Sequence, residues 1–165
     1  MNSKRLVVLA LLLILFCSPV FASLISFMFV ETGLGLGDEI SGPQHGSVWE
    51  GGLMEVFFEA GYIVTNSPIS RMERKPDQVL SGIILTDFEE AAVGGADFYI
   101  LGFLECRVHG GLAIPLNMTI IAYETYSKEP VFEHIFSISS ERTINQEFEF
   151  AKDAGIILLN QIKGL

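Results

Sequence analysis

Residues 24–31 form a nearly unbroken apolar run that is rich in Phe, Ile and Val. A strand with one face in water alternates apolar and polar residues, whereas a strand covered on both faces is apolar throughout. The run therefore predicts the central strand of a sheet that has other structure packed on it. A chain organised around such a strand is expected to carry helices on the sheet.

The residues that follow predict a β-α-β unit. Residues 32–46 contain five glycines and a proline and are expected to form a loop. Ser47 and Glu50 have the spacing of a capping box, so the helix is expected to begin at Ser47, and Gly61 is expected to end it. Residues 62–65 then return as a strand that is parallel to the first.

The rest of the chain predicts a second helix, a meander and a terminal helix. Residues 66–77 are polar, and residues 79–85 are expected to be a strand or an extended connection. Asp87 with Glu90 repeats the capping signature and predicts a short helix that ends near residue 94. Three antiparallel strands and a helix are expected at residues 97–108, 112–126, 131–138 and 145–162. The predicted fold is α/β, with one mixed sheet of about five strands in the order β-α-β-α-β-β-β-α and helices packed on the sheet.

The first 22 residues have the composition of an export signal. Lys4 and Arg5 precede an apolar run over residues 6–16, and Val20 and Ala22 are the small residues that signal peptidase requires. Cleavage is expected after Ala22. Residues 23–165 would then be a single globular domain, periplasmic or secreted, with no integral membrane span.

Two other interpretations of the leader remain open. Cys17 could be lipidated, although the bulky Phe16 before it departs from the small residue that a lipoprotein signal requires. The leader could also stay as an anchor, because apolar character resumes at Leu24. Ser18 and Pro19 interrupt that stretch, which favours cleavage.

The charge of the exported chain disfavours two classes of partner. Removing Lys4 and Arg5 from ten cations leaves eight against 20 carboxylates, a formal charge of −12. Such a field repels phosphate backbones and anionic lipid headgroups. We therefore expect no nucleic-acid partner.

The motifs for catalysis, cofactors and metals are weak. The glycines of residues 33–37 precede a helix expected only at Ser47, so a dinucleotide fingerprint does not fit. His45, His109 and His134 lack metal-ligand spacing, and Cys106 lies in an apolar strand pattern where cysteine acts as a small hydrophobe. The sequence thus predicts no catalytic residue, no metal and no cofactor, with a hydrolase as a remote alternative.

Polar residues in two loops form the best candidate contact site. Loops that follow parallel strands meet at one end of the sheet, where open α/β sheets bind ligands. The loops at residues 31–46 and 66–72 are expected there. Glu31, Asn66 and Arg71 are their best polar members for a ligand or a partner.

The order of elements carries a family resemblance. Residues 47–53, Ser-Val-Trp-Glu-Gly-Gly-Leu, open the first helix, and residues 61–65, Gly-Tyr-Ile-Val-Thr, return as a strand. This arrangement resembles small envelope α/β modules: the amino-terminal domain of the Tol-system propeller protein, the curli-secretion lipoprotein and penicillin-binding-protein activator lipoproteins. The resemblance implies that the chain works through protein contacts in the cell envelope and not by catalysis.

Our hypothesis is therefore an exported, non-catalytic domain that binds or organises another envelope component, with an envelope protein as its partner. This hypothesis predicts a free sheet edge or an exposed apolar patch near residues 131–138. The alternative is a periplasmic small-ligand-binding protein, which predicts a pocket where Glu31, Asn66 and Arg71 converge. The sequence does not predict an oligomeric state.

Overall fold

The computed structural model describes residues 22–35, 44–138 and 142–164. The predicted export signal up to residue 21, including Cys17, lies outside this range, as does the middle of the loop after the first strand. Within the described residues the elements follow the order β-α-β-β-α-β-β-β-α. They are β1 (Leu24–Thr32), α2 (His45–Glu59), β2 (Ile63–Asn66), β3 (Ser70–Met72), α3 (Gly82–Val93), β4 (Phe98–His109), β5 (Leu112–Glu124), β6 (Pro130–Ser137) and α4 (Ile144–Ile162).

One mixed sheet holds all the described strands, which confirms the predicted fold class. β4 lies beside β1 and is parallel to it, and β5 and β6 continue the sheet as antiparallel strands. On the other side of β1, β2 pairs with its first half and β3 with its last residues, both in parallel. β1, predicted as the central strand, thus has neighbours on both sides, although β4 lies in the middle of the strand order.

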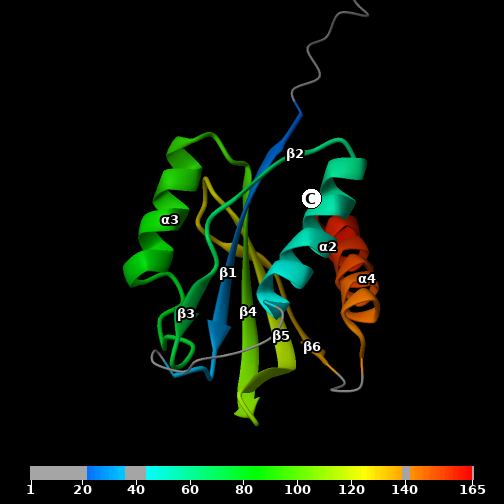
Figure 1. Ribbon diagram of the computed structural model, residues 1–165. Coiled ribbons are helices and arrows are strands. Elements are labelled where there is room, and N and C mark those ends of the chain that lie inside the picture. The colour runs from blue at the N-terminus through cyan, green and yellow to red at the C-terminus, as the bar shows by residue number, and fades with distance from the viewer. Residues whose placement is uncertain (1–21, 36–43, 139–141, 165) are drawn as a thin grey trace, which may run out of the picture.

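The two faces of β1 are covered by different helices (Figure 1). Ile25, Phe27 and Phe29 belong to the apolar cluster that includes α2 and α4. Met28 and Val30 belong to a second cluster, which includes α3. The apolar run was therefore interpreted correctly as a strand buried on both faces.

The predicted start of the first helix is wrong by two residues. α2 begins at His45 after Gln44, and Ser47 lies inside the helix, so the capping box at Ser47 and Glu50 does not form. The helix can begin earlier because the Glu31 carboxylate, which comes from β1, accepts a hydrogen bond from the Gly46 N–H at 3.2 Å. A distant side chain satisfies an amide that the sequence assigned to a local cap. The predicted end is correct, since Gly61 follows the helix with φ +89°.

The segment before the second helix also differs from the prediction. α3 begins at Gly82, so Asp87 lies within the helix and accepts a hydrogen bond from the Tyr99 hydroxyl at 2.7 Å. Ile84 and Phe88, four residues apart, are both buried and fix the helical face. Helical spacing therefore prevails over the capping signal at Asp87.

The sequence missed β3, which is only three residues long. β2 pairs with β1 up to the Phe27 and Asn66 positions. The end of β1 would then lack a neighbour on that side, and β3 supplies one by pairing with Val30, Glu31 and Thr32. Such a short strand follows from backbone hydrogen bonding and leaves no periodic pattern in the sequence.

α2 and α4 pack closely against each other. A Cβ added at Gly52 would lie 2.7 Å from the Cβ of Ala151, and one at Gly155 would lie 3.2 Å from a methyl carbon of Val56. The glycines thus allow the two helices to approach. At its start α4 has a complete capping box formed by Thr143 and Gln146, which fixes its first turn near the start of α2.

Candidate functional site

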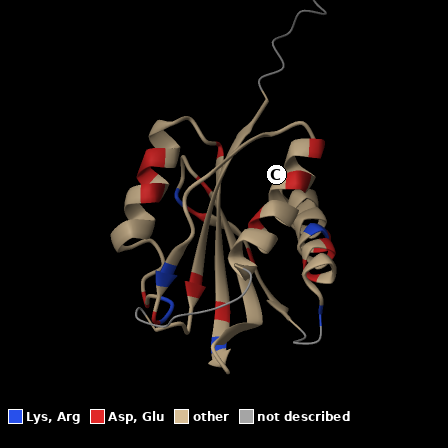
Figure 2. Cartoon of the chain, viewed as in Figure 1, with Lys and Arg blue, Asp and Glu red and all other residues tan. Residues whose placement is uncertain are grey.

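The structure brings two of the three predicted site residues together at the end of the sheet where β1 and β3 finish. Figure 2 shows acidic and basic segments of neighbouring strands at this end. Glu31 and Arg71 are register partners, and the Arg71 Nε lies 3.1 Å from the Glu31 Oε2. Asn66 pairs with Phe27 instead, four residues back along β1, or about 13 Å from the position of Glu31. The role of the three residues in contacting a ligand or partner stays a prediction.

The Glu31 carboxylate connects three elements. Its Oε1 accepts the hydrogen bond from Gly46 in α2, and its Oε2 forms the ion pair with Arg71 in β3. Glu31 is only 3 % exposed, whereas the Arg71 side chain is 39 % exposed. A carboxylate is favourable at a helix N-terminus, and here it also neutralises the arginine. Arg71 is therefore the member of the pair that a partner could reach.

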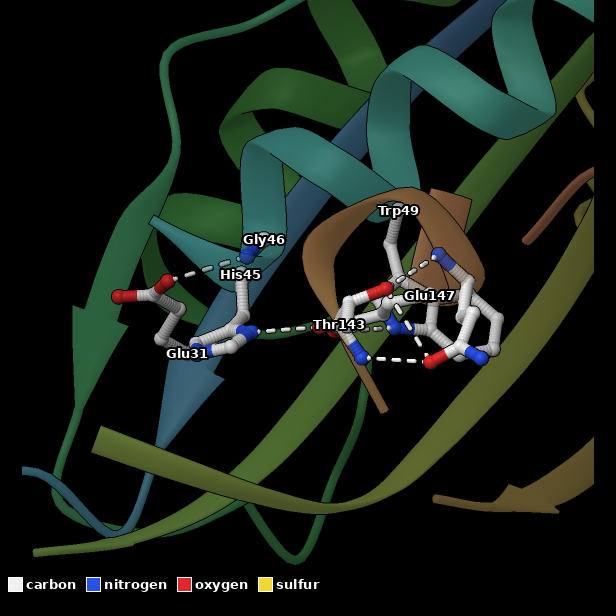
Figure 3. A network of polar contacts seen from close by, with 7 residues as sticks. Glu31, His45, Gly46, Trp49, Thr143 and Glu147 are labelled. Atoms are coloured by element: carbon white, nitrogen blue, oxygen red, sulfur yellow. Dashed lines mark hydrogen bonds and ion pairs between the residues drawn. The ribbon is translucent and has the colours of Figure 1, made fainter. Parts of the chain in front are cut away.

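A second buried carboxylate joins α2 to α4 (Figure 3). Glu147, on the first turn of α4, is 1 % exposed. Its Oε2 lies 2.6 Å from the His45 Nδ1, and its Oε1 accepts a hydrogen bond from the Trp49 Nε1 at 3.0 Å. His45 and Trp49 are four residues apart on α2 and present both donors on one side of that helix.

This geometry changes the acid–base behaviour of His45. The hydrogen bond to Glu147 raises the pKa of His45 above its usual value, although burial of the imidazole opposes this effect. The Nδ1 donates to the carboxylate, so the pair is strongest when the ring is protonated. His45 is thus a group whose charge is coupled to the packing of α2 on α4.

Burial also shifts the pKa of Glu50, the other member of the capping box that does not form. The loss of hydration raises the pKa of this carboxyl, and a hydrogen bond from Asn66 opposes the shift. Asn66 therefore contacts Glu50 on α2, away from Glu31 and Arg71.

A pocket of about 320 Å³ opens at the same end of the sheet. We call it the strand-end pocket, and its lining comprises Thr32, Gly33, Glu73, Arg74, Lys75, Phe103, Glu105 and Thr119. Phe103 belongs to the apolar cluster of α3. The pocket therefore lies on the α3 side of the sheet, opposite the Glu31 carboxylate, which contacts α2.

Neither the cysteine nor the other histidines form a reactive constellation. Cys106 is buried, and the loss of hydration raises the pKa of its thiol to about 12, so little thiolate is present near neutral pH. His134 packs edge to face on Phe136 at 4.6 Å between ring centroids, and His109 is exposed at the end of β4. In the described ranges, no three His, Cys, Asp or Glu residues are grouped so that they could hold a metal ion.

β6 forms a free edge of the sheet. Among the described strands it pairs with β5 alone. The register places Glu133 and Ile135 opposite Ile121 and Thr119, hence on the α3 side, and there Ile135 is 60 % exposed. The edge expected near residues 131–138 is therefore present.

Within the described parts of the chain, no helix combines the length and apolarity needed to cross a bilayer.

Sequence reasoning missed the residues that hold α2 and α4 together. Glu147 lies 98 positions from Trp49 along the chain, so no local pattern connects them. The only available signal was the four-residue spacing of His45 and Trp49, which would place both on one helix face if the helix began at His45.

The comparisons with known proteins concern the fold alone. No protein-family model matches the chain, and no curated protein matches it. Solved structures with a similar arrangement include the PelC dodecamer from Paraburkholderia phytofirmans. The sequence identity is 13 %, the TM-score is 0.49, and the match covers 85 % of this chain and 86 % of the PelC chain. The LpoB C-terminal domain from Salmonella enterica is 13 % identical with a TM-score of 0.45, over 76 % and 90 % of the two chains.

TolB from Acinetobacter baumannii is similar as well. It is 14 % identical with a TM-score of 0.44, and the match covers 87 % of this chain but 29 % of TolB. The resemblance to the Tol-system propeller and penicillin-binding-protein activator types of module is confirmed as a likeness of topology.

Proposed function

We propose that this chain is an exported, non-catalytic domain that binds or organises another component of the cell envelope. The observation that carries the proposal is the free edge of β6 with its exposed apolar side chain. The predicted export signal supplies the compartment. The proposed partner is an envelope protein.

A free edge strand is a binding surface because its outer N–H and C=O groups lack partners within the sheet. An extended segment of another protein can form main-chain hydrogen bonds there, and side-chain contacts then give specificity. On β6, Ile135 offers apolar surface, and beside it lies the Glu133 carboxylate, which is 59 % exposed and 3.9 Å from the Lys75 Nζ. The edge thus suits an extended segment that carries apolar and basic residues.

Site-specific crosslinking in intact cells tests the proposal. A photoreactive phenylalanine analogue replaces Ile135 in the full chain, and a second strain carries it at Val93. Val93 is a matched control because it is an exposed apolar residue on α3, away from β6. We expect one discrete protein adduct from position 135 and none from position 93.

The variant Ile135→Lys provides a second measurement. A charge on an edge strand opposes strand addition, and the side chain is exposed, so the fold is expected to persist. Crosslinking from a neighbouring β6 position, Ser137, should then disappear. If position 135 gives no adduct, or if Ile135→Lys leaves the adduct from Ser137 unchanged, β6 is not the binding edge.

The compartment has its own test. Amino-terminal sequencing of the protein from the cell fraction where it accumulates should begin at Ser23. A chain that retains Met1 and fractionates with cytosolic enzymes would contradict export.

A further inference from the structure

The strand-end pocket lies where the chain leaves two parallel neighbours in opposite directions. β1 and β3 are adjacent and parallel. After β1 the chain goes on to α2, and after β3 it goes on to α3 on the other face of the sheet (Figure 1). In open α/β sheets, such a divergence leaves a crevice outside the carboxyl ends of the strands, where ligands bind.

A backbone hydrogen bond joins the two described segments that flank this crevice. The Gly33 N–H donates a hydrogen bond to the Glu73 carbonyl oxygen at 3.1 Å, which ties the end of β1 to the segment after β3. Gly33 has φ +80°, and a Cβ there would lie 2.1 Å from the Cys106 carbonyl oxygen. A side chain at position 33 would therefore clash with the backbone of β4 at Cys106. The volume of about 320 Å³ falls at the small end of the range for ligand sites, about 300–1,000 Å³.

The lining combines an aromatic side chain with charges of both signs. Phe103 is buried, and the Lys75 Nζ lies 5.1 Å from the centroid of its ring and 3.9 Å from the Glu133 Oε1, which lies outside the pocket lining. Arg74 is exposed and has no ion-pair partner in the described part of the chain. Glu73 and Glu105 also line the pocket, and Glu105 accepts a hydrogen bond from the Asn117 amide at 3.1 Å.

The balance of these charges indicates the ligand. Two cations and two carboxylates line one small volume, so a ligand with a single sign of charge would meet two like charges. A polyanion would also be repelled by the acidic chain as a whole. A molecule with separate positive and negative ends can place each end against the opposite charge.

We propose that the strand-end pocket binds a small zwitterion, either an amino acid or a short peptide. Its carboxylate contacts Arg74 and Lys75, its ammonium group contacts Glu105 and Glu73, and its side chain packs toward Phe103. The pocket adjoins the proposed binding edge, because its Lys75 Nζ lies 3.9 Å from the Glu133 Oε1 of β6. The proposed contacts to the zwitterion do not include Ile135, on which the test of the β6 edge depends.

Calorimetric titration of the purified chain with the dipeptide leucylalanine tests the site. N-acetyl-leucylalanine lacks the ammonium group, and leucylalanine amide lacks the carboxylate. We expect leucylalanine to bind and each blocked peptide to bind at least about tenfold more weakly, because each loses a charge-assisted contact. Amide NMR shifts on binding should centre on Gly33 and Thr119, which line the pocket.

Two variants test which pocket residues contact the carboxylate end and the ammonium end of the peptide. Arg74→Gln should weaken leucylalanine binding and reduce the discrimination against the amide, since Lys75 remains. Glu105→Gln should reduce the discrimination against the acetylated peptide, since Glu73 remains. Arg107→Gln and Glu129→Gln are matched controls, since both residues are exposed and lie outside the lining, and they should bind as the unmodified chain does.

Three outcomes would overturn the proposal. They are no binding of leucylalanine, equal binding of the free and blocked peptides, and shifts centred away from the pocket. Circular dichroism verifies that each variant is folded. The crosslinking result at Ile135 is separate, so failure of one experiment does not decide the other.

Discussion

Replacement of Glu147 should destabilise the domain strongly because this buried carboxylate accepts two hydrogen bonds. A hydrogen bond to a charged group contributes about 1.5–3 kcal/mol, and breaking a buried pair costs about 3–5 kcal/mol. Glu147→Ala leaves the Trp49 N–H buried without its acceptor, whereas His45 can turn partly toward water since 13 % of its side chain is exposed. We therefore expect a loss of about 3 kcal/mol, at the lower end of that range. Glu147→Gln keeps the shape and an acceptor for Trp49 and should cost about 1–2 kcal/mol.

The same contact predicts a pH dependence with a definite sign. His45 has a raised pKa in the folded state, against a reference value of 6.5. The folded chain therefore holds the proton more tightly than the unfolded chain does. The resulting stabilisation is fully present below the unfolded value and is lost as the pH rises through the folded value. The free energy of unfolding should thus be larger at about pH 5.5 than at about pH 8.

Urea unfolding followed by the fluorescence of Trp49 measures both effects, because this is the single tryptophan and it is fully buried. His45→Gln and the double variant with Glu147→Gln complete a cycle that isolates the pair from other titrating groups. Each single variant should reduce the pH-dependent difference. If Glu147→Gln retains the full difference, or if Glu147→Ala costs less than about 1 kcal/mol, the buried pair does not stabilise the packing of α2 on α4.

Three further predictions concern close packing and the thiol. Gly33→Ala should lower the free energy of unfolding by about 2 kcal/mol or more, because Gly33 has a positive φ and its Cβ would clash with the Cys106 carbonyl. Gly61→Ala is the control: Gly61 also has a positive φ but open space around it, so its loss of stability should be smaller. Gly102→Ala should cost about 1–3 kcal/mol in thermal or urea unfolding, because its Cβ would lie 2.4 Å from the Phe29 ring, and a neutral result would contradict this packing. The Cys106 thiol, buried and with its pKa raised to about 12, should react with a disulfide reagent only after urea is added; rapid reaction of the native protein would refute its burial.

Local patterns predicted most of the fold. The burial of β1 on both faces, the hairpin at Gly110 and Gly111 and the end of α2 at Gly61 all agree with the sequence interpretation. Each of these features depends on residues within a few positions of one another, so the spacing of apolar residues and the turn-forming residues predict it. Two failures arise from distant groups, since the Glu31 carboxylate allows α2 to begin earlier and the last residues of β1 pair with β3. The third, the start of α3 at Gly82, arises from local helical spacing that outweighs the capping signal at Asp87.

The candidate site was predicted only in part. Placing polar loop residues at the end of the parallel strands correctly brought Glu31 near Arg71, since strand direction follows from the β-α-β unit. Asn66 was expected beside them but pairs with Phe27, because the loop sequence does not determine at which residue of β1 the pairing with β2 ends. The strand-end pocket is lined in part by Arg74 and Lys75, which lie in the segment of residues 66–77 that the sequence analysis described as polar and did not include among the candidate site residues.

What the amino-acid sequence determined is which segments are buried and on how many sides, because the spacing of apolar residues reports the surroundings of each strand or helix. What only the tertiary structure decided is which polar groups meet. Glu147 reaches Trp49 across 98 positions, and Glu31 faces both Gly46 and Arg71, because helix packing and strand register are properties of the whole assembled sheet.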